Sequence, residues 1–595
     1  MSASRVDQIR PPGGGDDGGI GGLALPDEVA VKRSDPIYNA HAYLTKVPVA
    51  AIVPFLEAFT APGDIVLDMY GGSGMTGVAA ISSGRQGEIR DISALGKHIG
   101  TNYLNLIEPQ EFRAVSSRVV DSAEARIGGV YLLPCEECDR TATLSRTVWS
   151  FVYECRDCGA HVNYYESFRA ARWQKAEMKC GSCANRFTAR GASRVAEAAV
   201  FDTVSCECSS KLRDQRHTSP PDPLDSAADP FPGMTIGEER QMFQASALRR
   251  HGLLTTSSFF SRRNLVVLST LREEIGKVED EGMRSKLLFA FTGILSRASK
   301  RYQWHPKRPL NAANQNYYIA PVFFEWNVYD LFQRKVEAAI RSDSHVRERM
   351  SSHGVEQVEG FRYEIGSADN LNLADGSVDY VFTDPPFGSN IFYGDMNLFQ
   401  EAWLDVCTDS EHEAVVDRSR GESARGIERY ERLITASLKE AFRVLRADGW
   451  ISIVFSNSQG EMWAVLQRAL ASAGFAPEEV TLLSKGQRSV KGLASGFENV
   501  VTVDLVISAQ KKCDGKSLEL PSRPGEDLDV LIRRVLDCGA ATTPSHLYLR
   551  LVRHYLRHGW DLSDLHIRDV MGSLQLAMYG VDAASGQIVS LDQAA

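Results

Sequence analysis

The sequence lacks any apolar run that reaches the roughly 18–20 residues of a membrane-spanning helix. It also lacks an apolar signal-peptide core; its start contains PPGGGDDGGIGG, a composition typical of a flexible lead-in. Positive charge is not in excess either, since the net charge is -10. Any contact with nucleic acid would therefore need local basic patches rather than a global field. We expect a cytoplasmic protein that makes no membrane contact.

Cysteine is scarce outside one segment, because eight of the 11 cysteines lie between Cys135 and Cys208. In a large chain without a secretion signal, such clustering favours metal binding over disulfides. Two Cys-x-x-Cys pairs separated by 16 residues predict one structural zinc ion held by four thiolates, and these are Cys135, Cys138, Cys155 and Cys158. A third such pair and a Cys-x-Cys pair predict a second zinc ion, held by Cys180, Cys183, Cys206 and Cys208.

These closed thiolate sites leave no open position for a substrate, so we expect structural rather than catalytic zinc. His161 is a candidate substitute ligand, although a surface histidine is the more common interpretation. A redox role for the cysteine pairs is the alternative, and metal explains this many clustered thiols better.

Patterning divides the chain into two α/β segments that flank a long insertion. Each α/β segment is too short for a complete doubly wound sheet, so the simplest interpretation is one sheet interrupted by the insertion. The predicted units are a disordered segment 1–34, α/β halves 35–125 and 351–512, a cysteine-rich insertion 126–235, a helical insertion 236–350, and a helical C-terminal region 513–595.

A glycine turn follows the first predicted strand in IVLDMYGGSGMTG. Asp68 ends the strand, and glycines at such a position let backbone N–H groups approach a ligand. The spacing is neither G-x-G-x-x-G nor a phosphate loop, which disfavours dinucleotides and nucleoside triphosphates. A short turn with an acid suits S-adenosylmethionine, and Asp91, near the next strand end, is placed to accept both ribose hydroxyls. A strand–helix turn without a ligand is the alternative.

The stretch SVDYVFTDPPFGSNIFYGD ends a second predicted strand in Asp384, Pro385, Pro386 and Phe387. Two prolines cannot continue a strand, so they fix a rigid corner. Asp384 and the carbonyl of Pro385 suit acceptance of the N–H groups of an exocyclic base amine that gains positive charge during methylation. Phe387 suits stacking on a base withdrawn from its helix. A structural turn is the alternative.

Together these motifs resemble the amino-methyltransferases that methylate adenine N6 or cytosine N4 in DNA. TDPPFGSNIFYGDMNLFQEAWL resembles their catalytic motif, and HAYLTK with DMYGGSGMT resembles their cofactor motifs, with Met69, Tyr70 and Met75 as departures. The resemblance covers roughly residues 35–105 and 360–510. It implies an α/β fold: a Rossmann-like methyltransferase sheet split by a zinc-ribbon and helical insertion, followed by a helical C-terminal region.

The resemblance also implies a function and a set of site residues. The expected activity is S-adenosylmethionine-dependent methylation of a flipped base in double-stranded DNA; the aspartate of the catalytic motif favours adenine N6, with cytosine N4 or an RNA amine as alternatives. Restriction-modification or phage-defence proteins are the partners that such enzymes imply. The implied catalytic residues are Asp384, Pro385, Pro386 and Phe387. The implied cofactor residues are Thr45, Lys46, Asp68, Tyr70, Gly72, Gly74, Asp91 and Ser367.

Two basic segments are candidates for nucleic-acid contact. RASKRYQWHPKRP interleaves Lys300, Arg301, Lys307 and Arg308 with aromatic side chains, and SKGQRSVKG is a second basic stretch. For the first segment, a helix end followed by a buried aromatic strand is the alternative. For the whole protein, a non-catalytic zinc-ribbon binding or scaffold protein is the alternative from a different functional class.

Overall fold

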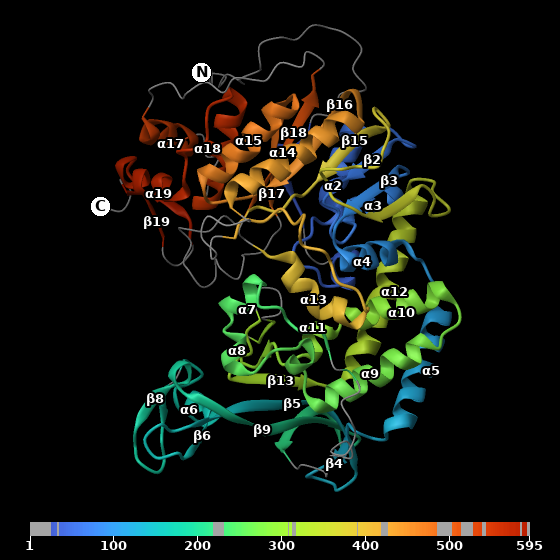
Figure 1. Ribbon diagram of the computed structural model, residues 1–595, viewed down its shortest axis with the longest axis vertical. Coiled ribbons are helices and arrows are strands. Elements are labelled where there is room, and N and C mark those ends of the chain that lie inside the picture. The colour runs from blue at the N-terminus through green and yellow to red at the C-terminus, as the bar shows by residue number, and fades with distance from the viewer. Residues whose placement is uncertain are drawn as a thin grey trace, which may run out of the picture.

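The computed structural model describes residues 25–31, 35–175, 177–217, 231, 233–307, 309–311, 317–388, 391–417, 426–484, 503–512, 527–537, 543–582 and 586–591. Two large β-sheets organise this part of the chain, one in the upper half and one in the lower half of Figure 1. Over the same ranges, no helix combines the length and apolarity that a membrane crossing requires.

The first sheet, here called the core sheet, is built from both predicted α/β segments. Its strand order is β1-β17-β18-β16-β15-β2-β3-β14. The bounds are Glu28–Ala30 (β1), Phe475–Ser484 (β17), Asp504–Lys511 (β18), Leu445–Phe455 (β16), Val378–Thr383 (β15), Ile65–Asp68 (β2), Gln86–Asp91 (β3) and Phe361–Ile365 (β14). Strands β14, β3, β2, β15 and β16 are parallel, and β18 is antiparallel to both of its neighbours. The predicted single Rossmann-like methyltransferase sheet split by an insertion is thereby confirmed.

The middle of the core sheet is buried on both faces, because alternate side chains of one strand enter different cores. In β2, Val66 packs into one hydrophobic cluster and its neighbour Leu67 into the other. The first cluster includes side chains from α2 (Val49–Phe59), α3 (Met75–Ser82) and α4 (Ala94–Leu104). The second includes side chains from α14 (Ile427–Val444), α15 (Gly460–Ala473) and α18 (Pro544–His558).

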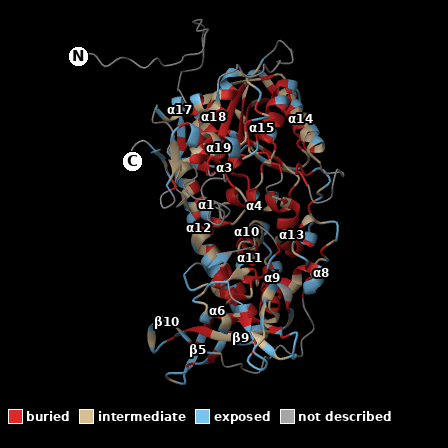
Figure 2. Ribbon diagram, turned by 90° about the vertical axis from the view of Figure 1, so that its left-hand side faces the viewer, coloured by how far each residue is buried: buried red, intermediate tan, exposed pale blue. Residues whose placement is uncertain are grey.

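The second sheet, here called the insertion sheet, is centred on a long antiparallel ribbon. Its order is β10-β9-β5-β13-β11-β12, with β4 and β6 also pairing with β5. The bounds are Ser209–Arg216 (β10), Ser193–Cys206 (β9), Thr141–Glu154 (β5), Val322–Trp326 (β13), Tyr302–Gln303 (β11), Leu310–Asn311 (β12), Leu132–Pro134 (β4) and His161–Asn163 (β6). Strand β13 therefore joins the predicted helical insertion to the cysteine-rich one. Figure 2 shows this ribbon at the end of the molecule remote from α14 and α15.

A layer of helices connects the two sheets. It contains α5 (Pro109–Ile127), α9 (Arg262–Gly276), α10 (Glu281–Thr292), α11 (Leu295–Ala298), α12 (Val328–Ser352) and α13 (Tyr393–Trp403), which lie between the sheets in Figure 1. Within this layer, Lys286 donates to Asp343 at 2.6 Å and to the carbonyl of Asn102 at 2.7 Å. Both charged side chains are buried, and unpaired charges there would be costly. The pair therefore fixes α10 against α12 and against α4 of the core.

The described C-terminal region is helical, as predicted, apart from one short hairpin. It contains α17 (Leu528–Asp537), α18, α19 (Ile567–Leu576) and the hairpin β19 (Tyr579–Val581) with β20 (Ile588–Ser590). At the other end of the chain, Glu28–Ala30 lie within the segment predicted to be disordered, yet they form β1 parallel to β17. Residues 1–24 and 32–34 of that segment lie outside the described residues.

Candidate active site and metal centres

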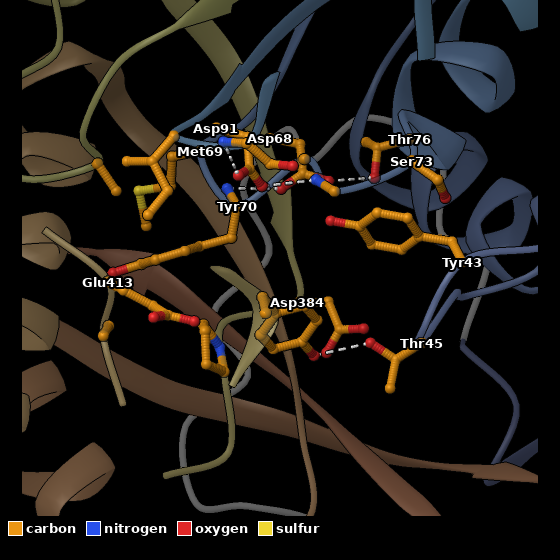
Figure 3. A pocket seen from close by; sticks show the side chains of 18 of the residues that line it. Tyr43, Thr45, Asp68, Met69, Tyr70, Ser73, Thr76, Asp91, Asp384 and Glu413 are labelled. Atoms are coloured by element: carbon orange, nitrogen blue, oxygen red, sulfur yellow. Dashed lines mark hydrogen bonds between the residues drawn. The ribbon is translucent and has the colours of Figure 1, made fainter. Parts of the chain in front are cut away.

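A large cavity lies where the carboxyl ends of β2, β3, β14 and β15 meet, as expected for ligand sites in open α/β sheets. The space inside the cavity and its open mouth together amounts to about 960 Å³. Figure 3 shows Asp68 and Asp91 on one side of this space and Asp384 on another. The predicted glycine turn and Asp-Pro-Pro corner are thus brought to one cavity. Asp68 and Thr383, which are hydrogen-bonded to each other here, are 315 positions apart in the chain.

Side chains are excluded at several positions of the glycine turn, among them Gly72 and Gly74. Gly72 has φ +47°, and a Cβ there would lie 3.1 Å from the ring of Tyr43. Its carbonyl accepts a hydrogen bond from Tyr363 at 2.7 Å. Gly74, with φ +77°, begins α3 and lies against Gly100, whose Cα would be 2.7 Å from an added Cβ. Gly72 lines the cavity, whereas Gly74 does not and serves the close packing of α3 on α4.

Asp68 holds the two halves of the site together. Its carboxylate accepts hydrogen bonds from the Tyr70 amide at 3.1 Å, from Thr76 at 2.7 Å, and across the sheet from Thr383 at 2.9 Å. Thr383 is the last residue of β15 and directly precedes Asp384. Burial raises the pKa of Asp68 to about 6, although these three donors oppose that shift. Asp68 therefore joins the glycine turn to the Asp-Pro-Pro corner.

Asp91 ends β3, as predicted, and lines the cavity beside Ser367. Its carboxylate accepts the Gly72 amide at 2.7 Å and the Ser93 amide at 2.8 Å, one on each oxygen. A carboxylate has about four acceptor positions, so further donors can be accommodated. Burial raises the pKa of Asp91. Ser367 follows β14, whose Ile365 pairs with Asp91, so strand pairing brings both side chains to one edge.

The Asp-Pro-Pro-Phe corner is held from behind by two hydrogen bonds. Tyr430 of α14 donates to the carbonyl of Pro386 at 2.6 Å, and Asn457 donates to that of Phe387 at 2.8 Å. Asp384 and Pro386 line the cavity, whereas Pro385 and Phe387 do not. The Phe387 ring packs edge-on against Phe455, with centroids 5.2 Å apart. The structure thus places Asp384 at the cavity, whereas the half-buried Phe387 ring packs against Phe455 outside the cavity lining, and its stacking on a base stays a prediction.

Thr45 and Lys46 also line the cavity, but only Thr45 presents its polar group there. The Thr45 and Tyr393 hydroxyls lie 2.8 Å apart. The Lys46 ammonium instead donates to the carbonyls of Tyr38 and His41, the latter at 2.8 Å. Burial lowers the pKa of Lys46 to about 7. Lys46 therefore ties the segment before α2 together rather than placing a fixed positive charge in the cavity.

Several cavity residues were not among the sequence predictions. Tyr393 and Asn397 lie on α13, and Asn397 donates to Ser93 at 3.1 Å. Glu413 accepts the Gly394 amide at 3.0 Å and is buried. The stretch NIFYGD is part of the Asp-Pro-Pro motif, so Tyr393 could have been predicted from it. Glu413 lies in a segment without periodicity, so no local pattern indicated it.

The eight clustered cysteines form two groups of four, as the sequence predicted, but with different membership. One group is Cys135, Cys138, Cys206 and Cys208; the other is Cys155, Cys158, Cys180 and Cys183. Within each group all sulfur atoms lie within 4.8 Å of one another, and the nearest pairs are 3.5–3.6 Å apart. A tetrahedral zinc ion with Zn–S bonds of about 2.3 Å needs sulfur separations of about 3.8 Å. Both groups therefore fit such an ion.

The predicted pairing of Cys135 and Cys138 with Cys155 and Cys158 is wrong. Of the 16 residues between these pairs, 14 form β5, a strand that would span about 46 Å. Strand β9 returns antiparallel to β5, with Ser205 opposite Thr143, and brings Cys206 back to the first pair. The pairing is thus set by a long hairpin, which cysteine spacing does not reveal.

Three cysteine pairs share one local turn. The residue after the second cysteine has positive φ in each case, and its amide donates to the carbonyl of the first cysteine at 2.8–3.0 Å. These turn residues are Asp139, Gly159 and Ala184. In the first group, Arg213 also donates to the sulfur of Cys208 at 2.8 Å, which favours the thiolate form. His161 is not a member of either group.

The first predicted basic segment is largely absorbed into the protein. Arg301 is buried against the rings of Phe399 and Tyr317, and burial lowers its pKa to about 10. Trp304 is buried, and Lys300 pairs with Glu197 at 2.8 Å. The alternative of a helix end followed by buried aromatic residues therefore holds for Lys300, Arg301 and Trp304, while Lys307 remains exposed. Arg308 and the second basic stretch, SKGQRSVKG, lie outside the described residues, apart from its first residue, Ser484.

Comparison with known proteins gives a family match over the first α/β segment. Residues 26–109 match a family model described as DNA methylase. YubD of Escherichia coli (strain K12), whose name describes a methylase, is 47% identical over 62 residues, which are 10% of this chain and 26% of YubD. The matched region thus spans about a quarter of that relative.

Among solved structures, TrmN from Thermus thermophilus is 17% identical with a TM-score of 0.15, over 29% of this chain and 33% of that one. A SAM-dependent methyltransferase from Methanosarcina mazei is 12% identical with a TM-score of 0.15, over 30% and 79%. The family match falls on the glycine-turn half of the site. Residues 26–109 are therefore similar to DNA methylases, which confirms the resemblance for this part of the chain.

Proposed function

We propose that the protein is an S-adenosylmethionine-dependent DNA methyltransferase that methylates the exocyclic amine of a flipped base, most favourably adenine N6. The observation that carries this proposal is the shared cavity of the glycine turn and Asp384, joined by the hydrogen bond from Thr383 to Asp68 at 2.9 Å.

The charge of the cavity supports this cofactor class. Its described lining contains the carboxylates of Asp68, Asp91, Asp384 and Glu413, and the Lys46 ammonium is turned into the protein. Such a lining suits a cationic ligand and disfavours a phosphate-bearing one. S-adenosylmethionine would supply an electrophilic methyl group on a positively charged sulfur. Gly72, Asp91 and Ser367 would hold its adenosine and amino-acid parts.

Asp384 has the central chemical role in this proposal. An exocyclic amine conjugated to a base is a weak nucleophile, and it gains positive charge when it attacks a methyl group. A carboxylate that accepts one of its N–H groups stabilises that charge. The hydrogen bonds from Tyr430 and Asn457 keep the corner in place before the substrate enters, so little reorganisation is needed. Tyr393 and Thr45 would border the base.

Exposing DNA and RNA separately to the protein and S-adenosylmethionine, then analysing nucleosides by mass spectrometry, tests the function. We expect N6-methyladenine in DNA; N4-methylcytosine or a methylated RNA amine would instead support the corresponding alternative. Asp384→Ala should abolish methylation while cofactor affinity by calorimetry stays within about threefold. Glu356→Ala, an exposed carboxylate away from the cavity, is the matched control. Full activity of Asp384→Ala, or no cofactor binding by the wild type, would contradict the proposal.

We also propose that each cysteine group binds one structural zinc ion. The support is the four-sulfur geometry and the repeated turn. A structural zinc site contributes on the order of 10 kcal/mol to folding, which suits a ribbon with little core of its own. Elemental analysis of the full chain should give two zinc ions per protein, and a metal-free, folded protein would contradict this.

A further inference from the structure

The far end of the β5–β9 ribbon carries an unusual charge for this protein. Residues 154–194, which include the second cysteine group, contain eight Lys and Arg against four Asp and Glu, a net charge of +4, whereas the whole chain carries -10. The segments around the first cysteine group, 135–140 and 206–216, contain four basic and five acidic residues. The positive charge therefore belongs to one end of the ribbon, near α6 and β8 (Arg186–Thr188) in Figure 1.

A turn after α6 (Tyr164–Ala170) presents part of this charge. Arg172 and Trp173 both have positive φ, at 54° and 66°, and the Trp173 amide donates to the carbonyl of Phe168 at 2.9 Å. Two successive non-glycine residues in this conformation are uncommon, and such turns are often retained for function. Arg172 and Lys175 are exposed on the turn.

Aromatic packing fixes this turn to the end of the first predicted basic segment. The Trp173 ring lies 5.1 Å from that of Trp304 and 5.6 Å from that of Phe168. The amide of Lys307 donates to His305 Nδ1 at 3.1 Å, so Nε2 carries the hydrogen and donates to the Trp173 carbonyl at 3.2 Å. The exposed Lys307 is thereby held beside the turn.

Arg172 and Lys175 on the turn and Lys307 beside it are exposed, and the three cations together are here called the Trp173 surface. Among the described residues, no carboxylate lies within 4.0 Å of these three cations, in contrast to Arg169 and Lys300, which pair with Glu166 and Glu197. Exposed cations without acidic partners on a fixed frame suit a polyanion whose charges are regularly spaced.

We propose that the Trp173 surface binds the phosphate backbone of duplex DNA outside the base that enters the cavity. This inference relies on the proposed function only for the identity of the nucleic acid. In Figures 1 and 2, α6, which directly precedes the turn, lies in the half of the molecule away from the core sheet, so contacts there would give affinity and orientation without reading sequence. The second cysteine group would hold this end of the ribbon in shape.

The test compares the full-length wild type with the triple variant Arg172→Glu, Lys175→Glu, Lys307→Glu on a duplex of about 40 base pairs. We expect at least tenfold weaker binding by fluorescence anisotropy near 0.1 M salt. The slope of log affinity against log salt should also fall by about 0.9 for each phosphate that the variant no longer neutralises. The matched control Lys97→Glu, Arg118→Glu, Lys439→Glu changes the net charge equally at exposed positions elsewhere.

The outcomes separate this inference from the proposed function. Unchanged affinity and slope in the triple variant, or an equal loss in the control, would overturn the inference. Methylation by the wild type would still uphold the proposed function in that case. Loss of affinity for single-stranded RNA but not for duplex DNA would overturn the DNA assignment. A wild type that binds DNA through these residues yet methylates nothing would uphold the surface and contradict the function. Equal zinc content and melting temperature would show that the triple variant is folded.

Discussion

Thr383→Val removes the hydrogen bond that joins β15 to the glycine turn. Valine has nearly the shape of threonine, and Thr383 is fully buried, so the change deletes the donor without opening a cavity. The deleted bond, 2.9 Å long, runs to the carboxylate of Asp68, and hydrogen bonds to charged groups contribute about 1.5–3 kcal/mol. For a domain of about 150–250 residues this corresponds to a fall in melting temperature of about 3–12 °C.

The pH dependence makes this prediction specific. The pKa of Asp68 in the folded protein is about 6, above its ordinary value of 3.8, so folding takes up a proton between these values. Stability associated with this group is therefore greatest at low pH and falls as pH rises through 6. Losing the Thr383 donor penalises the ionised form. The deficit of the variant should be larger at about pH 8 than at about pH 5.

Differential scanning fluorimetry between these two pH values measures this deficit. Ser452→Ala is the matched control, because it removes a neutral bond to Ser508, 2.6 Å long, between β16 and β18. Its cost of about 0.5–1.5 kcal/mol should not vary with pH. The methylation rate of Thr383→Val should also fall, by up to about 100-fold, if Asp384 moves by about 1 Å. A deficit that is constant across this pH range would refute the role assigned to Asp68.

Three further predictions concern the glycine turn, the two cysteine groups and the buried amine of Lys46. Gly72→Val should weaken S-adenosylmethionine binding at least tenfold by calorimetry, because φ is +47° and a Cβ would crowd Tyr43; unchanged affinity would contradict the placement of the turn. Cys208→Ser and Cys183→Ser should each lower the zinc content from two ions per chain to one by elemental analysis. Limited proteolysis should cleave the two variants at opposite ends of the β5–β9 ribbon. Cleavage at the same end in both variants would contradict the revised pairing. The pKa of Lys46 is lowered by burial to about 7, so the unfolded chain holds more protons above that pH. The melting temperature of the wild type should accordingly rise relative to Lys46→Met between about pH 7 and pH 10, and a constant difference would contradict it.

The sequence predicted those parts of the site that depend on strand ends. Asp68, Asp91 and Asp384 each follow a short β-forming run, and parallel strands bring their carboxyl ends to one edge, so the cavity could be anticipated from local patterns. The order β15-β2 follows from the same rules once the insertion is set aside.

The parts that failed depend on contacts between distant segments. Spacing grouped Cys138 with Cys155, but an intervening strand separates them and a hairpin selects the partners. Arg301 has the sequence context of a surface cation, yet its guanidinium packs on Phe399 of α13. Such outcomes depend on tertiary packing, which single-sequence patterns do not contain.

The adjacency of β2 and β15 has a consequence for biosynthesis. Their hydrogen-bonded residues Asp68 and Thr383 are 315 positions apart in the chain, and a ribosome adds about 5–20 residues per second. After β2 has been synthesised, about 15–60 s therefore pass before its neighbouring strand β15 emerges, and this edge of β2 is unpaired during that time. The ribbon of β5 and β9 emerges complete during that interval, so its two strands can pair before β15 is synthesised.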